Sequence, residues 1–274
     1  MDPFLFSAII LALTGCFIGF ASGFFGVGGG FLMVPVQFWL LTSLGVDPTL
    51  AIRVAFGTSL AVVLPTAFSS AYGHYCRQCV LVKPLILMLV PGIIGGFIGA
   101  AISSHAPGRI LELLFGAVLI LAAVRMYFSH ASCKDNRVPD SLLVYAPWGF
   151  VFGLVSGMLG IGGGIVMVPV MTTILGYPIR QAIGTSTAFM LCSSVGGVIS
   201  YIINGLSVPG LPPFSLGYVD IAFWAVLAVV SVPVAQLGVR AAHRIPPDRI
   251  RILFILLMVV MGVHMIAGLY VNSS

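Results

Sequence analysis

Charged residues are scarce in this chain, at 7% of its 274 residues. A soluble domain carries about a quarter charged residues, so a surface exposed to water is excluded. The five cysteines lack the spacing of a disulfide framework. Cys76 and Cys79 form one C-x-x-C in a predicted loop, without the second pair that a tetrahedral metal site needs. We therefore expect neither a metal nor a cofactor.

Apolar residues take the place of the missing charges. They make up 59% of the chain, the mean hydropathy is +1.16, and apolar runs of membrane-spanning length follow one another with short loops. The sequence predicts an all-α, multi-pass integral membrane protein surrounded by the lipid bilayer. No basic residue precedes the first run, so we expect a retained helix rather than a cleaved signal. The cations lie in loops beside the spans, without interleaved aromatic residues, and nucleic acid is not an expected partner.

One glycine-dense motif occurs twice. Residues 19–36 read GFASGFFGVGGGFLMVPV and residues 153–170 read GLVSGMLGIGGGIVMVPV, with eleven of eighteen paired positions identical. Such a repeat indicates an internal duplication. We expect one membrane domain made of a first transmembrane repeat at 1–128, a cytoplasmic linker at 129–141 and a second repeat at 142–274.

The apolar runs predict about eight to ten membrane segments. A short run follows each glycine triplet and reaches only about 16 to 20 Å as a helix, less than the bilayer core of about 30 Å. We expect glycine-broken or re-entrant helices there, with either five or three full crossings per half. Short, glycine-interrupted segments at matching places in two halves are typical of a transporter binding site. The predicted runs are 4–24, 31–43, 50–72, 80–102, 109–128, 142–160, 165–175, 182–203, 216–239 and 250–270.

The basic residues predict how the halves are oriented. An odd number of crossings per half inverts the second copy and leaves only Arg53 and Arg109 on one side. An even number would split the twelve cations seven to five. The positive-inside rule therefore favours inverted repeats, with both termini outside the cytoplasm. The ten cations expected on the cytoplasmic side are Arg77, Lys83, Arg125, Lys134, Arg137, Arg180, Arg240, Arg244, Arg249 and Arg251.

The glycine triplets are candidate anion-binding segments. Adjacent glycines weaken a helix and expose backbone N–H groups at the start of the next helix, where the helix dipole is positive. Two such helix starts converging from opposite sides would make an anion site. Close helix packing through small residues is the alternative explanation. The candidate residues are Gly28, Gly29 and Gly30 in the first copy and Gly162, Gly163 and Gly164 in the second.

A second paired motif stands at the opening of one long run in each half. Its arginine lies about one helical turn before a Gly-Thr-Ser sequence, so guanidinium and hydroxyl donors could face one cavity and bind an oxyanion. Alternatively, the arginines anchor helix ends and the hydroxyls bond their own helix. The two sets are Arg53, Gly57, Thr58 and Ser59, and Arg180, Gly184, Thr185 and Ser186.

These motifs carry a family resemblance. The paired G-x-x-S-G-x-x-G-x-G-G-G-x-x-M-V-P segments, each followed by a G-T-S helix start, resemble the sulfite exporter TauE/SafE family over essentially the whole chain. The resemblance implies movement of sulfur-containing oxyanions, such as sulfite, sulfoacetate or other organosulfonates, across the cytoplasmic (inner) membrane. It extends to the glycine segments and the G-T-S starts, and it does not identify one substrate.

We expect a secondary transporter that exports small sulfur oxyanions by alternating access. The alternatives are an anion channel and a carrier for a different small anion. We do not expect an enzyme, because no nucleophile stands near a base and an acid in the spans. His264, inside the last run, is a coupling candidate or a packing residue, and Gln37 and Asn204 could donate to a ligand or bridge helices. A homo-oligomer is compatible with the sequence.

Overall fold

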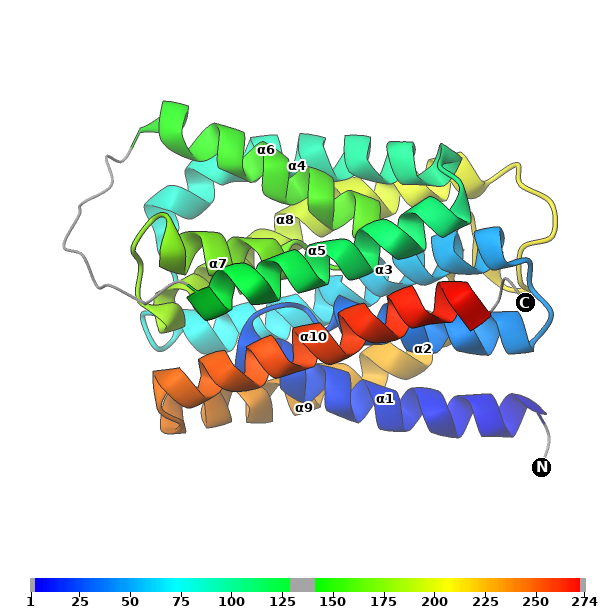
Figure 1. Cartoon of the computed structure of the whole chain (residues 1–274), viewed down its shortest axis with the longest axis horizontal. Helices are drawn as coiled ribbons and strands as arrows, with labels where there is room; N and C mark the ends of the chain where they lie inside the picture. The colour runs from blue at the N-terminus through cyan, green and yellow to red at the C-terminus, as the bar shows by residue number, and fades with distance from the viewer. Residues whose placement is uncertain (1–2, 129–140, 272–274) are drawn as a thin grey trace.

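The computed structural model describes residues 3–128 and 141–271. Within them the chain forms ten α-helices and one short antiparallel hairpin of strands (Figure 1). The helices of the first half are α1 (Pro3–Phe25), α2 (Gly30–Ser43), α3 (Pro48–Tyr75), α4 (Val82–His105) and α5 (Gly108–Phe128). Those of the second half are α6 (Leu142–Leu159), α7 (Gly164–Thr173), α8 (Ile179–Gly205), α9 (Ile221–Arg244) and α10 (Pro247–Val271), and the strands are β1 (Ser215–Leu216) and β2 (Val219–Asp220). The predicted linker lies outside the described residues except for Ser141.

Six helices of the described residues are long and apolar enough to cross a membrane, so the predicted all-α, multi-pass membrane architecture is confirmed. They are α3, α4, α5, α8, α9 and α10. The most apolar stretch of α3 is 78% buried and that of α10 only 28%. Apolar side chains that are not buried by protein must face lipid, because exposing so many of them to water is energetically unfavourable. The molecule is therefore arranged around α3 and α8, with the outer helices exposed to the bilayer.

The two glycine-rich breaks produce the short helices that the sequence predicts. α2 has 14 residues and α7 has 10, so their lengths are about 21 and 15 Å. α2 returns toward the end of the molecule at which α1 begins (Figure 1). Each half thus contains three long helices, preceded by a pair of helices that turn back at the glycine segment.

The start of α9 differs from the prediction. The apolar run was expected from 216, but residues 215–220 form a hairpin, in which Ser215 pairs with Asp220 and Leu216 with Val219, and α9 begins only at Ile221. Gly217 turns the chain with φ of 58°, and the backbone N–H of Tyr218 donates to the carbonyl of Tyr201 in α8. An apolar composition alone does not reveal this turn, because hydrogen bonds to another helix hold it.

α3 and α8 pack against each other and run in opposite directions. The N–H of Leu81, just beyond the end of α3, donates to Thr185 near the start of α8. At the other end, the N–H of Asp220, beyond the end of α8, donates to Thr58 near the start of α3. The start of each long helix therefore lies at the end of the other.

The halves exchange their first helices. α1 packs along α9 of the second half, and α6 packs along α4 of the first half. Glycines make both contacts close: a Cβ atom on Gly23 would overlap the carbonyl oxygen of Ala235, and one on Gly157 would overlap that of Gly96. Small residues let helix backbones approach in this way in membranes. Separating the two halves would therefore break the contacts of α1 with α9 and of α6 with α4.

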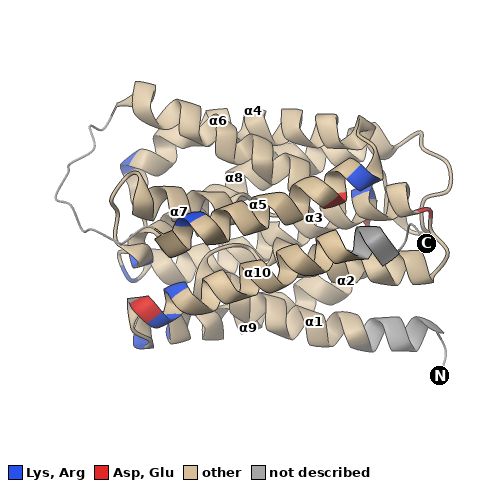
Figure 2. Cartoon of the chain, in the orientation of Figure 1, with Lys and Arg blue, Asp and Glu red and all other residues tan. Residues whose placement is uncertain are grey.

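The two ends of the molecule differ in charge. α1 begins and α10 ends at one end (Figure 1), while most lysines and arginines of the described residues gather at the opposite end (Figure 2). The inverted arrangement of the halves and the side of the membrane on which the termini lie stay predictions.

Candidate functional site

Each glycine segment has the same backbone conformation. Gly28 and Gly162 have φ of 73° and 82°, and Gly29 and Gly163 have φ of 72° and 83°. L-residues rarely adopt these values, because the Cβ atom approaches the following carbonyl oxygen. These glycines are therefore required for the left-handed turns at which α2 and α7 start, and Gly26 and Gly160, with φ of 66° and 69°, directly follow α1 and α6.

The two glycine segments lie against each other in the core of the molecule. A Cβ atom on Gly30 would lie 2.6 Å from the carbonyl oxygen of Gly160, and one on Gly164 would lie 2.6 Å from that of Gly26. A Cβ atom on Gly28 or on Gly162 would lie 2.9 Å from the same sulfur of Met190 in α8. Two segments that are 134 positions apart in the sequence thus contact each other in the fold.

Two helices begin at this contact. Gly29 and Gly163 occupy the N-cap positions of α2 and α7, and glycine has no side chain to accept from the first backbone N–H groups. Both helix starts are buried, as are all three glycines of each triplet. Two positive dipole ends therefore face the same region, which suits a small anion.

One serine of the G-T-S motifs bonds a glycine segment, and the other bonds the helix that follows a glycine segment. Ser186 donates to the carbonyl of Gly26 at 2.7 Å, which links α8 to the first segment. Ser59 accepts from the side chain of Gln37 in α2 at 3.4 Å. All three side chains are buried. In the described part of the chain, the amide oxygen of Gln37 has no hydrogen-bond partner, so this region retains unused polar capacity.

The threonines and glycines of the same motifs instead contact the loops that lead into α4 and α9. Thr58 and Thr185 each accept, at 2.9 Å, from the backbone N–H of an N-cap residue, Asp220 of α9 and Leu81 of α4. A Cβ atom on Gly57 or Gly184 would overlap a carbonyl oxygen in the same loops. These four residues therefore hold in place the loops that lead into α4 and α9.

We expect Thr58→Val and Thr185→Val each to lower the free energy of unfolding by about 1–3 kcal/mol, because a buried N–H loses its acceptor. Thermal unfolding in detergent measures the effect. Thr42→Val is the matched control, since the Thr42 hydroxyl bonds only carbonyls of its own helix. Equal stability of the threonine variants and the control would contradict this capping role.

The two arginines lie far from each other. Arg53 donates to the carbonyl of Ala106, the C-cap of α4, and approaches the Tyr218 hydroxyl at 3.3 Å. Arg180 donates to the carbonyls of His243 and Ile245 at the end of α9. Because α3 and α8 are antiparallel and about 40 Å long, the two guanidinium groups stand at opposite ends of the molecule. They therefore do not line one shared cavity here, although the Nε of each is buried without a partner in the described residues.

Comparison with known proteins identifies the family. The family model described as Sulfite exporter TauE/SafE matches residues 11–265. The chain belongs to the sulfite exporter TauE/SafE family. It is 31% identical to a probable membrane transporter protein of Haemophilus influenzae, over 95% of this chain and 99% of the relative. It is 30% identical to one of Methanocaldococcus jannaschii, over 96% and 97%. No solved structure matches.

Family membership and these names indicate a membrane transporter rather than an enzyme. The six long apolar helices agree with this class.

Other candidates in this TauE/SafE member lie apart from the glycine segments. His264 is exposed on α10, and Asn204 donates to Ser200 of its own helix. No group of three metal-ligating side chains occurs among the described residues, so Cys76 and Cys79 have no third ligand there. The roles predicted for the glycine triplets, the G-T-S starts, the arginines and His264 in binding or coupling stay predictions.

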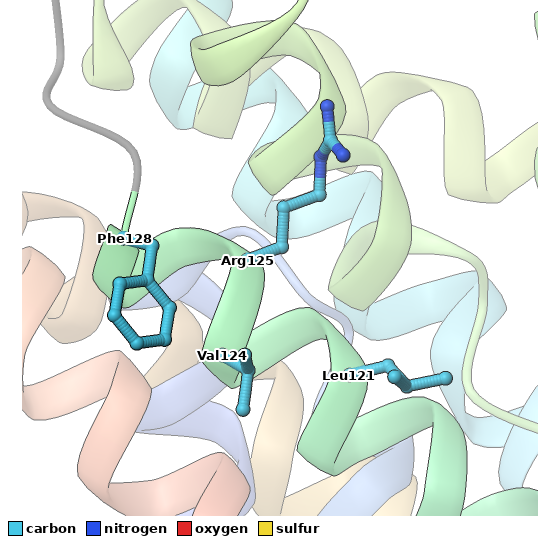
Figure 3. Close-up of a pocket in the computed structure, with 4 residues that line it drawn as sticks. All are labelled: Leu121, Val124, Arg125 and Phe128. Atoms are coloured by element: carbon cyan, nitrogen blue, oxygen red, sulfur yellow. The ribbon is translucent and has the colours of Figure 1, made fainter.

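One cavity of about 580 Å³ lies against the end of α5 (Figure 3). Three of its lining side chains, Leu121, Val124 and Phe128, are apolar and exposed. The fourth, Arg125, already donates to Thr173 of α7 at 3.3 Å. This lining does not suit an anion, and we do not assign transport to this cavity.

Some buried polar residues of this family member were not selected from the sequence. Ser193 of α8 donates to the carbonyl of Gly162 and accepts from Ser156, and Tyr218 stands beside Arg53. Ser156 could have been found, because Ser22 occupies the paired position of the first motif. Tyr218 gave no such signal, since it lies in a hairpin outside both motifs.

Proposed function

We propose that this protein is a secondary transporter that moves a small sulfur-containing oxyanion, such as sulfite or an organosulfonate, out of the cytoplasm by alternating access. In this proposal, residues 1–128 and 142–274 are inverted repeats that together form one transport unit. The substrate class comes from the family, and the anion preference also has independent support in the chemistry of the site.

The contact between the two glycine segments is the observation that carries the proposal. It brings two buried helix starts, from different halves, to one place in the core. Backbone N–H groups and the hydroxyl of Ser59, whose oxygen accepts from Gln37, are neutral donors, which can bind an anion without a second buried charge. Unwound backbone at membrane depth is tolerated where it is buried or lines a cavity, and transporters use it for binding.

Arg53 and Arg180 take separate roles in this proposal. Each stands at one end of the α3–α8 pair and has a buried Nε without a partner in the part of the chain that the structure describes. We assign to each the first or last contact with the anion at its own end, rather than a place in the central site. A guanidinium suits this task, because its fixed planar donors match an oxyanion.

The charge distribution supports an orientation. The end rich in lysine and arginine (Figure 2) would face the cytoplasm, and both termini would lie outside it, in the inner membrane. An anion carried without a compensating ion would then be driven outward by about 2.3 kcal/mol per charge per 100 mV.

Ligand-dependent thermal stabilisation of the detergent-purified protein tests the function. We expect sulfite, sulfoacetate, taurine or thiosulfate to raise the unfolding temperature selectively, with sulfate and chloride as comparisons, because a ligand that binds only the native state stabilises it. Stabilisation by none of the sulfur compounds would contradict the proposed substrate class. Flux in vesicles that fails to saturate with substrate would favour a channel over a carrier.

We expect Arg53→Lys and Arg180→Lys each to weaken anion binding at the end of the molecule where that arginine lies by about tenfold, because lysine keeps the charge and loses the planar pair of donors. Titration of the stabilising ligand measures the affinity. Arg109→Lys is the matched control, since Arg109 is exposed at the start of α5. Wild-type affinity in both test variants would argue against recognition by the arginines.

A further inference from the structure

A pair of histidines lies at the lysine- and arginine-rich end of the molecule and takes no part in the proposed anion site. His74, near the end of α3, is 1% exposed, and its Nε2 lies 3.0 Å from the carbonyl oxygen of Gly23 in α1. His243, near the end of α9, is half-buried, and its Nε2 lies 3.3 Å from Nδ1 of His74. The pair therefore joins α9, α3 and α1 just before the first glycine segment.

The partners determine which ring atoms carry hydrogen. A carbonyl oxygen only accepts, so Nε2 of His74 donates to Gly23 and Nδ1 of His74 is left as an acceptor. Nε2 of His243 then donates to that acceptor. In this arrangement both rings are neutral, and Nδ1 of His243 is the one ring nitrogen of the pair that can take another proton without breaking either hydrogen bond. A proton there would make the bond to His74 charge-assisted and stronger.

The charged groups around the pair are positive. Arg77, in the turn after α3, and Arg180, at the start of α8, both act on His243, and α1 contributes the neutral carbonyl of Gly23. Burial raises the pKa of the nearby Cys79 thiol, which stays neutral. Further charges near the end of α9 are the exposed side chains of Arg240 and Arg244 and, at the start of α10, those of Asp248 and Arg249.

Arg180 connects this pair to the proposed anion path. Its guanidinium donates to the backbone carbonyl of His243 itself, at 3.4 Å, and its Nε is buried without a partner in the described residues. An anion bound beside Arg180 would bring a negative charge close to His243. That charge would offset the positive field of Arg77 and Arg180 and favour a proton on His243.

We infer that His243, held in place by His74, is a proton-binding site whose occupancy is linked to the binding of the substrate anion beside Arg180. This inference rests on the proposed function and adds a second bound species, a proton, to it. Linkage is reciprocal: if the anion favours the proton, then the proton tightens anion binding by the same factor.

The test measures proton uptake when the full-length, detergent-purified protein binds an anion. Methanesulfonate and thiosulfate serve as probes, because their charge stays constant between about pH 5.5 and 8, the range in which histidine titrates. For sulfite, the difference between wild type and variant cancels the ligand's own titration. Calorimetry in two buffers with different ionisation enthalpies gives the number of protons taken up, and titration at several pH values gives the affinity.

For wild type we expect net proton uptake on binding and an affinity that rises by up to about tenfold per unit of falling pH. His243→Gln should bind the anion without proton uptake and with an affinity independent of pH, because the amide still donates to His74 but does not titrate. His105→Gln is the matched control, since His105 is exposed and bonds its own helix. His243→Asn replaces the glutamine variant if that variant unfolds.

The outcomes separate the two proposals. Proton uptake that persists in the His243 variants, or that is lost in His264→Gln instead, overturns the proton site and leaves the transport proposal intact. Binding of the anion by wild type with an affinity that does not depend on pH would also overturn the proton site and leave the transport proposal intact. Failure of wild type to bind any of sulfite, methanesulfonate and thiosulfate contradicts the proposed function, and the proton linkage falls with it.

Discussion

Gly30→Ala and Gly164→Ala are each expected to lower the free energy of unfolding by about 1–3 kcal/mol and to remove the stabilisation by substrate. The added Cβ atom would meet backbone atoms of the opposite segment, the carbonyl oxygen of Gly160 or of Gly26 at 2.6 Å. Backbone cannot rotate away as a side chain can, so the two segments must separate. Thermal unfolding with and without sulfite measures both effects.

Gly45→Ala is the control for this pair of variants. Gly45 has φ of 86°, so alanine is strained there, but no atom lies within 4 Å of the added Cβ. Strain alone costs about 1–2 kcal/mol and should leave the substrate effect intact. Normal substrate stabilisation in Gly30→Ala would mean that the contact between the segments is not needed for binding.

The helices could be predicted closely from the sequence. Short apolar runs after each glycine triplet were expected at 31–43 and 165–175, and α2 and α7 occupy Gly30–Ser43 and Gly164–Thr173. The reason is physical: lipid favours long apolar helices, and glycine adopts the left-handed turns between them without the strain that a Cβ atom causes. The signal is strong because both constraints act locally on the chain.

The contacts of the candidate residues could not be predicted in the same way. Thr58 and Ser59 are adjacent in sequence, yet one caps α9 and the other meets Gln37 of α2. Arg53 and Arg180 occupy equivalent places in the two halves, but the antiparallel packing of α3 and α8 puts them at opposite ends. Such partners depend on how the halves interlock, and a one-dimensional pattern carries no information on that arrangement.

Alanine substitutions of glycines on one face of α1 are also expected to lower the stability of the protein. We expect Gly19→Ala and Gly23→Ala to destabilise the protein by about 1–3 kcal/mol each, because the added Cβ atoms would overlap the carbonyl oxygens of Ser231 and Ala235 in α9. Gly15→Ala, on the same face, would meet the Val230 side chain at 3.2 Å. This contact is relieved by a shift of a few tenths of an ångström, and alanine favours a helix by up to about 1 kcal/mol, so we expect a smaller effect here. Thermal unfolding of the three variants in one detergent measures how the loss of stability differs between positions 15, 19 and 23.

The second half supplies an independent repetition of this experiment. Gly153 and Gly157 occupy the places of Gly19 and Gly23, and their Cβ atoms would overlap the carbonyl oxygens of Gly92 and Gly96 in α4. If both halves depend on an exchanged first helix, Gly157→Ala should destabilise the protein about as much as Gly23→Ala. A large effect in one half and none in the other would mean that the duplication is preserved in sequence while only one of the two exchanged contacts stabilises the fold.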